Sequence, residues 1–294
     1  MKLCTMTNLY YVNTPDGKGF LNSVRKNAEM GFMVQDFNMC AMQRNETELN
    51  GDNWESITYE IANEATKLGV EFAQSHIPYA KVNTRRKTPF DDGCEQNGHF
   101  VMLSERAVRI SGMLGVKWAV AHPVQDTSGI EFDPEADIKY NHFIYDKYVE
   151  LADKLGVGIA FENMADVDGY RRFGVTASEL ISLVDSFSAG NIGICWDFGH
   201  ANRVMKNQQL QILKLGNRLK ATHLDDNKGK DDLHTIPFFG SIDWNAVMHA
   251  LYEIGYDGAL NYEVAIMKRL PDELKDYAAK LMYETGKYLI GLAK

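Results

Sequence analysis

Six short apolar segments of the chain each end in a histidine, an aspartate or a glutamate. They are Gln74-Ser75-His76, Val120-Ala121-His122, Ala160-Phe161-Glu162, Cys195-Trp196-Asp197, Ala221-Thr222-His223 and Asn261-Tyr262-Glu263. Imidazole and carboxylate together suit zinc, manganese, cobalt or iron, whereas an all-oxygen set suits magnesium or calcium. A divalent ion would also supply the counter-charge that clustered carboxylates need. The pattern therefore predicts a site for one divalent ion, manganese or zinc in preference to cobalt, magnesium or iron.

A recurring glycine turn places these residues at the ends of strands. It occurs at Leu68-Gly69-Val70, Leu114-Gly115-Val116, Leu155-Gly156-Val157 and Ile254-Gly255-Tyr256. Glycine takes the left-handed conformation that ends a helix, so each turn predicts a helix that passes directly into a strand. Predicted strands lie near 2–7, 32–38, 70–76, 116–122, 157–163, 191–197, 219–224 and 258–264. Predicted helices lie near 19–30, 54–68, 97–114, 136–155, 176–187, 204–215, 243–254 and 271–291.

This strict alternation of strands and helices predicts a parallel α/β sheet. Eight such units close a (β/α)8 TIM barrel, and 294 residues suit one barrel of ~250 residues or more. We therefore expect residues 1–294 to form a single domain. A doubly wound open sheet is the alternative, but no GxGxxG motif follows the first strand. In a barrel the carboxyl ends of all strands surround one mouth, so the six polar side chains should converge there.

The composition is that of a globular protein, with 45% hydrophobic and 24% charged residues. A net charge of −9 disfavours nonspecific attraction to nucleic acid, so we expect no nucleic-acid partner. The chain contains no apolar run long enough to suggest a membrane span and no signal-peptide pattern at its start. The scattered Cys4, Cys40, Cys94 and Cys195 are expected to be reduced thiols. We therefore expect a cytoplasmic location and a small-molecule substrate, with homo-oligomers as a possibility.

Over residues 70 to 265 the chain resembles the xylose isomerase-like barrel superfamily, the sugar phosphate isomerase/epimerase group related to ketose 3-epimerases and endonuclease IV. The motifs that carry the resemblance are Ser75-His76-Ile77-Pro78-Tyr79, His122-Pro123, Phe161-Glu162-Asn163, Trp196-Asp197-Phe198-Gly199-His200, His223-Leu224-Asp225-Asp226 and Tyr262-Glu263. The resemblance implies that the metal is held by Glu162, Asp197, His223 and Glu263. It also implies that His200 binds a substrate oxygen.

The resemblance further implies isomerisation or epimerisation of a small sugar or sugar derivative through proton removal next to a carbonyl. Glu162 and Glu263 would act as the general bases or acids on the two sides of the substrate, and the metal would stabilise the enediolate. His76 and His122 would line the pocket or hold hydroxyl groups. Asp232 and His234 lie on a loop that could fold over bound sugar, so we also count them as substrate-binding candidates.

Three alternatives remain at this level. The first is a zinc-dependent apurinic-site endonuclease, because each of its nine metal ligands has a counterpart. The counterparts are His76, His122, Glu162, Asp197, His200, His223, Asp232, His234 and Glu263. The second is a dehydratase or lyase acting on a keto-sugar or keto-inositol, which begins with the same proton removal. The third is a sugar-binding module without catalysis, which would not need two glutamates beside a cation.

Two further segments bear on the substrate. The run Arg85-Arg86-Lys87 is interpreted as a solvated loop, with phosphate binding as the alternative. Where many relatives have Pro-Gly-Glu-Gly, this chain has Pro237-Phe238-Phe239-Gly240, so we expect the pocket wall to differ there. The sequence leaves the identity of the sugar, its phosphorylation and the oligomeric state open.

Overall fold

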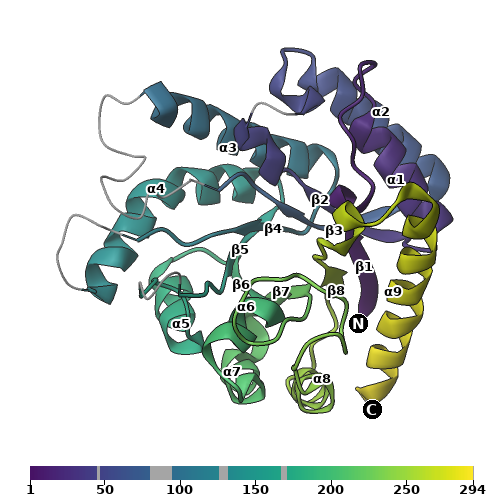
Figure 1. Ribbon diagram of the computed structural model, residues 1–294. Coiled ribbons are helices and arrows are strands. Elements are labelled where there is room, and N and C mark those ends of the chain that lie inside the picture. Colours follow the sequence, from purple (N-terminus) through teal and green to yellow (C-terminus); the bar gives the residue numbers. More distant parts are fainter. Residues whose placement is uncertain (45–46, 80–94, 126–131, 167–170, 294) are drawn as a thin grey trace.

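The computed structural model describes residues 1–44, 47–79, 95–125, 132–166 and 171–293, and its strands form a closed barrel (Figure 1). The strands are β1 (Lys2–Met6), β2 (Val34–Asn38), β3 (Glu71–His76), β4 (Trp118–Ala121), β5 (Gly158–Glu162), β6 (Ile192–Asp197), β7 (Leu219–Leu224) and β8 (Ala259–Tyr262). Each strand pairs in parallel with the next, and β8 pairs with β1. The predicted (β/α)8 TIM barrel is confirmed, and every strand begins and ends within two residues of its predicted bounds.

Helices surround the strands, with α9 packed beside β1 and α8 (Figure 1). The α-helices are α1 (Gly19–Glu29), α2 (Trp54–Leu68), α3 (Glu95–Met113), α4 (Pro134–Lys154), α5 (Ala177–Ser186), α6 (Phe198–Val204), α7 (Gln208–Leu215), α8 (Trp244–Glu253) and α9 (Asp272–Leu292). Short 3-10 helices include η2 (Cys40–Arg44) and η5 (Ile266–Arg269). Within the described ranges, none of the helices has the length and apolar character needed to cross a bilayer.

The glycine turns that predicted this alternation have the expected backbone. Gly69, Gly115, Gly156 and Gly255 all have φ between 68° and 72°. At Gly69 the backbone N–H groups after α2 donate hydrogen bonds to carbonyls of its last turn; for example, Val70 N donates to Ala65 O at 2.8 Å. Each helix therefore ends in a left-handed residue and the next strand starts within a few residues.

The predicted helix near 204–215 is wrong in its bounds. The structure has two helices there, α6 beginning directly after β6 and α7 beginning at Gln208. The cause is Asp197, whose Oδ1 accepts a hydrogen bond from the backbone N–H of His200 at 2.5 Å. Asp197 thus serves as the N-cap of α6, and a capped helix can start at once from the end of the strand.

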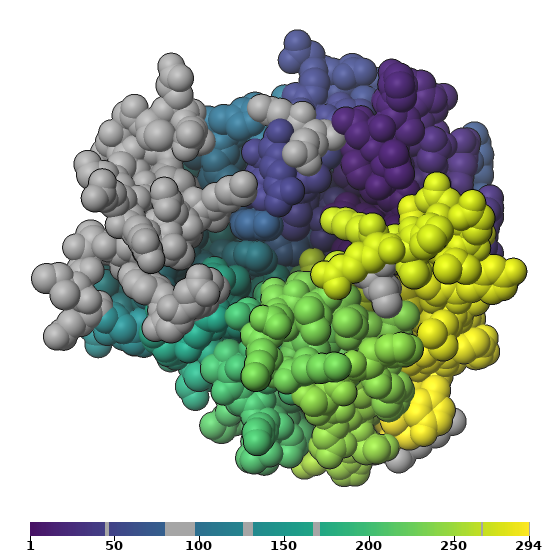
Figure 2. Space-filling view, viewed as in Figure 1, coloured from purple at the N-terminus to yellow at the C-terminus, as the bar shows by residue number. Residues whose placement is uncertain are grey.

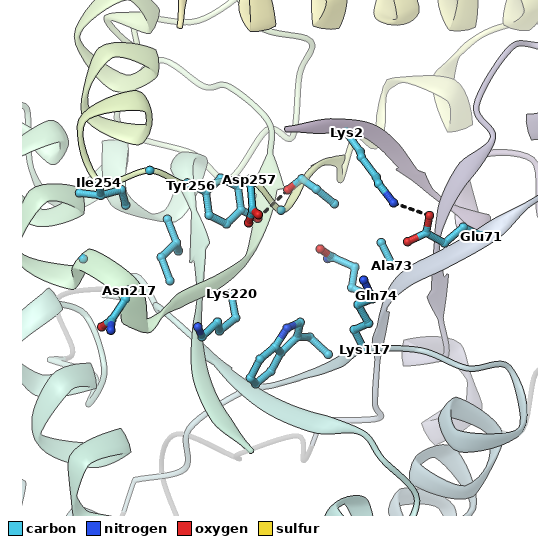
Figure 3. Close-up of a pocket in the computed structure, with 16 residues that line it drawn as sticks. Lys2, Glu71, Ala73, Gln74, Lys117, Asn217, Lys220, Ile254, Tyr256 and Asp257 are labelled. Carbon is cyan, nitrogen blue, oxygen red and sulfur yellow. Dashed lines mark hydrogen bonds and ion pairs between the residues drawn. The ribbon is translucent and has the colours of Figure 1, made fainter. Parts of the chain in front are cut away.

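Small side chains fill the barrel interior, and a tryptophan closes its amino end. Val120, Ala160, Cys195 and Ala221 are buried together against Trp118. A pocket of about 400 Å³ lies at this end, where Figure 3 shows Lys2 paired with Glu71 and Lys220 across from Gln74. Because this pocket is lined by the amino ends of strands, it lies at the opposite end of the barrel from the predicted site.

Two of the predictions from sequence fall partly or wholly outside the described residues. The run Arg85-Arg86-Lys87 and the thiol of Cys94 belong to that part of the chain. The other three cysteines, Cys4, Cys40 and Cys195, are free thiols.

Candidate metal centre at the barrel mouth

The nine histidines and carboxylates noted in the sequence meet at the carboxyl end of the barrel. Among the described residues there are four groups within which the candidate ligand atoms lie within 4.8 Å of one another. Three groups contain only the nine predicted residues: Glu162, Asp197, His223 and Glu263; His76, His122 and Glu162; and His200, Asp232 and His234. The fourth group joins Asp197 and His234 to Asp225. Glu162 belongs to two groups, so its carboxylate links the first two.

The first group is the set predicted to hold the metal. His223 Nδ1 lies 3.0 Å from Glu162 Oε1, 2.9 Å from Glu263 Oε2 and 3.7 Å from Asp197 Oδ2. Asp197 Oδ2 is buried and has no hydrogen-bond partner in the described part of the chain. An unpaired buried carboxylate oxygen is costly, and a divalent cation would satisfy it. These four residues therefore fit a divalent ion.

Pairing between β5, β6 and β7 aligns this group. The register places Asp197 beside His223 on neighbouring strands. Asn163, the residue after Glu162, accepts from Asp197 N through Oδ1 at 2.6 Å and donates through Nδ2 to Asp197 O at 2.9 Å. The Asn163 amide thus holds the end of β6 against the end of β5, which fixes the two carboxylates relative to each other.

His76 and His122 contact the other oxygen of Glu162. His76 Nε2 and His122 Nε2 lie 3.2 Å and 3.0 Å from Glu162 Oε2 and 3.2 Å from each other. The ring of Tyr79 stacks on His122 with centroids 4.7 Å apart. Both histidines, predicted as substrate-binding residues, therefore lie directly against a predicted metal ligand.

The third group adds His200 from α6 and two residues of the loop that follows β7. His200 Nε2 and His234 Nε2 lie 3.5 Å and 3.3 Å from Asp232 Oδ2. His234 has a φ of 44°, which a residue with a side chain rarely adopts, and its Nδ1 lies 3.0 Å from Glu263 O. Strain of this kind concentrates at functional sites.

The electrostatics of the mouth favour ionised glutamates. Burial raises the pKa of the Glu162 carboxyl, but His223 and His122 outweigh it and hold that pKa well below its usual range. Burial and His223 act in the same opposed way on Glu263, and the pKa falls to about 2. Burial lowers the pKa of His122 to about 4, so this imidazole is neutral at pH 7 and can bind a cation. Burial raises the pKa of Asp197 to about 6.

Sequence reasoning missed Asp36, a carboxylate in the interior of β2. Its Oδ2 accepts hydrogen bonds from Gln74 Nε2 at 3.0 Å and Asn261 Nδ2 at 2.7 Å. The same oxygen lies 3.9 Å from His223 Nε2, the nitrogen that faces away from the metal group. A charged residue inside a buried strand was the available signal, because buried aspartates need partners.

Asp225 and Asp226 follow β7 and have different roles. Asp225 is buried, its Oδ1 accepts from Gly199 N at 3.0 Å, and its Oδ2 lies 3.4 Å from His234 Nδ1. Asp226 accepts hydrogen bonds from the backbone N–H groups of Phe238, Ser241 and Ile242 and from the Trp244 indole. Asp226 thus organises the loop that carries Asp232 and His234.

Segment 237–240 has an unusual backbone. Phe238 has a φ of 75°, a conformation that glycine adopts freely and a residue with a side chain adopts rarely. Its side chain is 52% exposed and packs edge-on against Tyr288 of α9. The phenylalanine therefore packs on the outside of the barrel, against a helix.

With the geometry established, comparison with known proteins places the chain in a family. The family model described as "Xylose isomerase-like TIM barrel" matches residues 24–284. The chain belongs to this family, as its sequence motifs predicted.

Individual relatives agree with this assignment. An uncharacterized protein of Methanocaldococcus jannaschii is 34% identical over 39% of this chain and 39% of its own length. A D-psicose 3-epimerase of Enterocloster bolteae is 29% identical over 40% of this chain and 37% of its own length. The matches thus span about two fifths of these two relatives. A D-tagatose 3-epimerase-like protein has a similar structure, with a TM-score of 0.77, 22% identity and coverage of 100% and 98% of the two chains.

Proposed function

We propose that the protein is a divalent-metal-dependent isomerase or epimerase of a small sugar or sugar derivative. The observation that carries the proposal is the meeting of Glu162, Asp197, His223 and Glu263 in one group with an unpaired Asp197 oxygen. The similarity to a D-psicose 3-epimerase supports the substrate class. Manganese or zinc is the proposed ion, since the group mixes imidazole with carboxylates.

The roles of the residues follow from their positions. A metal held by the four residues would polarise the substrate carbonyl and hold negative charge on its oxygen. Glu263 is 19% exposed and borders a pocket, so it can reach a carbon-bound proton. Glu162 is only 1% exposed. It would accept a proton from the substrate, or return one, on the side of the substrate that faces the barrel interior. His200 would donate a hydrogen bond to a substrate oxygen, while Asp197 and His223 would serve as ligands only.

Removal of the metal tests this proposal. Dialysis against a chelator should abolish turnover of the ketose that the metal-loaded protein converts, and addition of manganese or zinc should restore this turnover. Thermal unfolding of the chelated protein serves as the control that the barrel is intact. Full turnover by chelated protein that elemental analysis shows to be metal-free would contradict the proposal.

The three ligand groups favour one second candidate, a zinc-dependent apurinic-site phosphodiesterase. Such an enzyme needs several cations to activate water and neutralise the attacking and leaving oxygens. A sugar isomerase should hold one tightly bound ion per chain. His76→Ala and His234→Ala should leave this metal content nearly unchanged, and His234→Ala should raise the KM for the sugar. Close to three zinc ions per chain, together with cleavage of abasic DNA, would replace the first candidate with the second.

A further inference from the structure

The outer face of α9 exposes a row of large apolar side chains. Leu274, Tyr277, Leu281 and Tyr288 follow one another at spacings of three, four and seven residues, so they lie on one side of the helix. Each of them is between 46% and 70% exposed. The buried residues of α9 occupy its opposite side, so this row faces away from the barrel core. Figure 2 shows α9 in yellow along one edge of the molecule, and every residue of the helix is described.

Phe238 extends this row from the loop that follows β7. Its ring contacts Tyr288 edge-on, with the ring centroids 5.9 Å apart. The φ of 75° at Phe238 is strained for a residue with a side chain. About half of the ring nevertheless remains in water, and a partner that covered it would remove this apolar surface from water. We call the five side chains the α9 patch: Leu274, Tyr277, Leu281, Tyr288 and Phe238.

The size of the α9 patch fits an interface between two copies of the chain. An aromatic side chain buries ~150–250 Å² when it is fully covered. At their exposed fractions, the three aromatic rings and two leucines therefore present about 500 Å². The largest apolar patch on a typical monomer is ~300–600 Å² and is often functional. Two α9 patches face to face would remove about 1,000 Å², and their charged flanks would bring the total into the ~1,200–2,000 Å² range of specific interfaces.

The order of residues along α9 makes this face self-complementary. Leu274 and Leu281 lie three residues before and four residues after Tyr277. A two-fold axis beside Tyr277 would therefore place Leu274 of each copy against the partner's Leu281. Glu273 and Lys280 lie four residues before and three residues after Tyr277, so the same axis would bring them together between copies. Neither of these two charged residues forms an ion pair within the described ranges, although other charged residues of α9 do.

We propose that the protein is a homodimer in solution, in which the α9 patches of two copies pack on each other across a two-fold axis beside Tyr277. The two α9 helices run antiparallel, and the same face supplies both sides of the interface. Tyr288 and Phe238 extend the contact toward the carboxyl end of each helix. This inference concerns assembly, so it goes beyond the proposed reaction and does not depend on it.

Analytical ultracentrifugation of the purified protein over nanomolar to micromolar concentrations tests the proposal. At micromolar concentration we expect a species with twice the 33.2 kDa mass of one chain, which dissociates on dilution. A single species of 33.2 kDa at every concentration would overturn the proposal.

A charge at the axis tests which face forms the dimer. Tyr277→Lys should raise the Kd of the dimer by about a hundredfold or more, because it removes a central aromatic residue and sets like charges against each other. Tyr59→Lys is the matched control, since it makes the same change at a tyrosine of α2 that is 62% exposed, and it should leave the Kd within twofold. Circular dichroism and thermal unfolding check that both variants are folded. An equal Kd in the two variants would overturn the proposal, because the dimer would then form through another face.

Charge reversal tests the antiparallel arrangement. Glu273→Lys and Lys280→Glu should each raise the Kd of the dimer several-fold, because each puts like charges together twice in the interface. The double variant restores opposite charges, so its Kd should return to within about threefold of that of the unaltered protein. A Kd in the double variant that is raised by the product of the two single effects would contradict the two-fold axis beside Tyr277.

Discussion

At the scale of single residues, the mouth of the barrel combines residues that can bind a metal with residues that orient them. Glu162 contacts His76 and His122 through one oxygen and His223 through the other. The strand-end pattern in the sequence predicted these residues, because each ends an apolar run. Asp36 was not predicted because it lies inside a strand rather than at the end of one. Only the fold shows that its carboxylate lies beside His223 Nε2.

The position of Asp36 leads to a prediction for metal affinity. Asp36 Oδ2 lies 3.9 Å from His223 Nε2, which is beyond hydrogen-bond distance, so the carboxylate acts on the ring through its charge. Loss of a hydrogen-bonded outer carboxylate typically costs 10–100-fold in metal affinity. We therefore expect Asp36→Asn to weaken metal binding by about tenfold or less, measured by competition with a chromophoric chelator. Thermal unfolding of the metal-free variant controls for a general loss of structure. An unchanged affinity in a folded variant would exclude Asp36 from this role.

At the scale of elements, the chain order of helix, glycine turn and strand determines the barrel. The sequence predicted all eight strands because four of the helix-to-strand turns carry the same glycine and the strands are nearly continuous in apolar residues. It did not predict α6, because this helix begins directly after β6 with no intervening loop or turn residue. One aspartate serves both purposes, with Oδ1 capping α6 and Oδ2 facing the metal group. Loops such as η2 and η5 follow no repeat, so the pocket that lies between them beside Glu263 could not be predicted.

The packing at the amino end of the barrel gives a second prediction. A Cβ added at Gly158 would lie 2.3 Å from the Trp118 ring, which fills the barrel at this level. Overpacking of this kind costs ~1–3 kcal/mol, so Gly158→Ala should lower the free energy of unfolding in urea by about that amount. Gly190→Ala is the matched control, because its added Cβ meets nothing within 4 Å. Equal stability of the two variants would show that Trp118 can move at little cost.

At the scale of the whole molecule, the candidate metal group and the pocket beside Glu263 are built from different parts of the barrel. The predicted metal ligands lie on β5, β6 and β7 and directly after β8, whereas the pocket takes much of its lining from the segments after β1 and β2. The two parts meet at Glu263 because β8 closes the barrel against β1.

The central claim is that a glutamate at the metal group transfers a proton at the carbon beside a sugar carbonyl. Turnover of the active ketose in heavy water, followed by NMR or mass spectrometry, tests this claim most directly. We predict deuterium at the exchanging carbon in the product and in recovered substrate. Glu162→Gln and Glu263→Gln should each reduce the rate ~100-fold or more in a folded, metal-loaded protein, because a positioned acid or base contributes 10²–10⁴-fold. Product that forms at the normal rate with no deuterium would indicate a hydride shift and contradict the account.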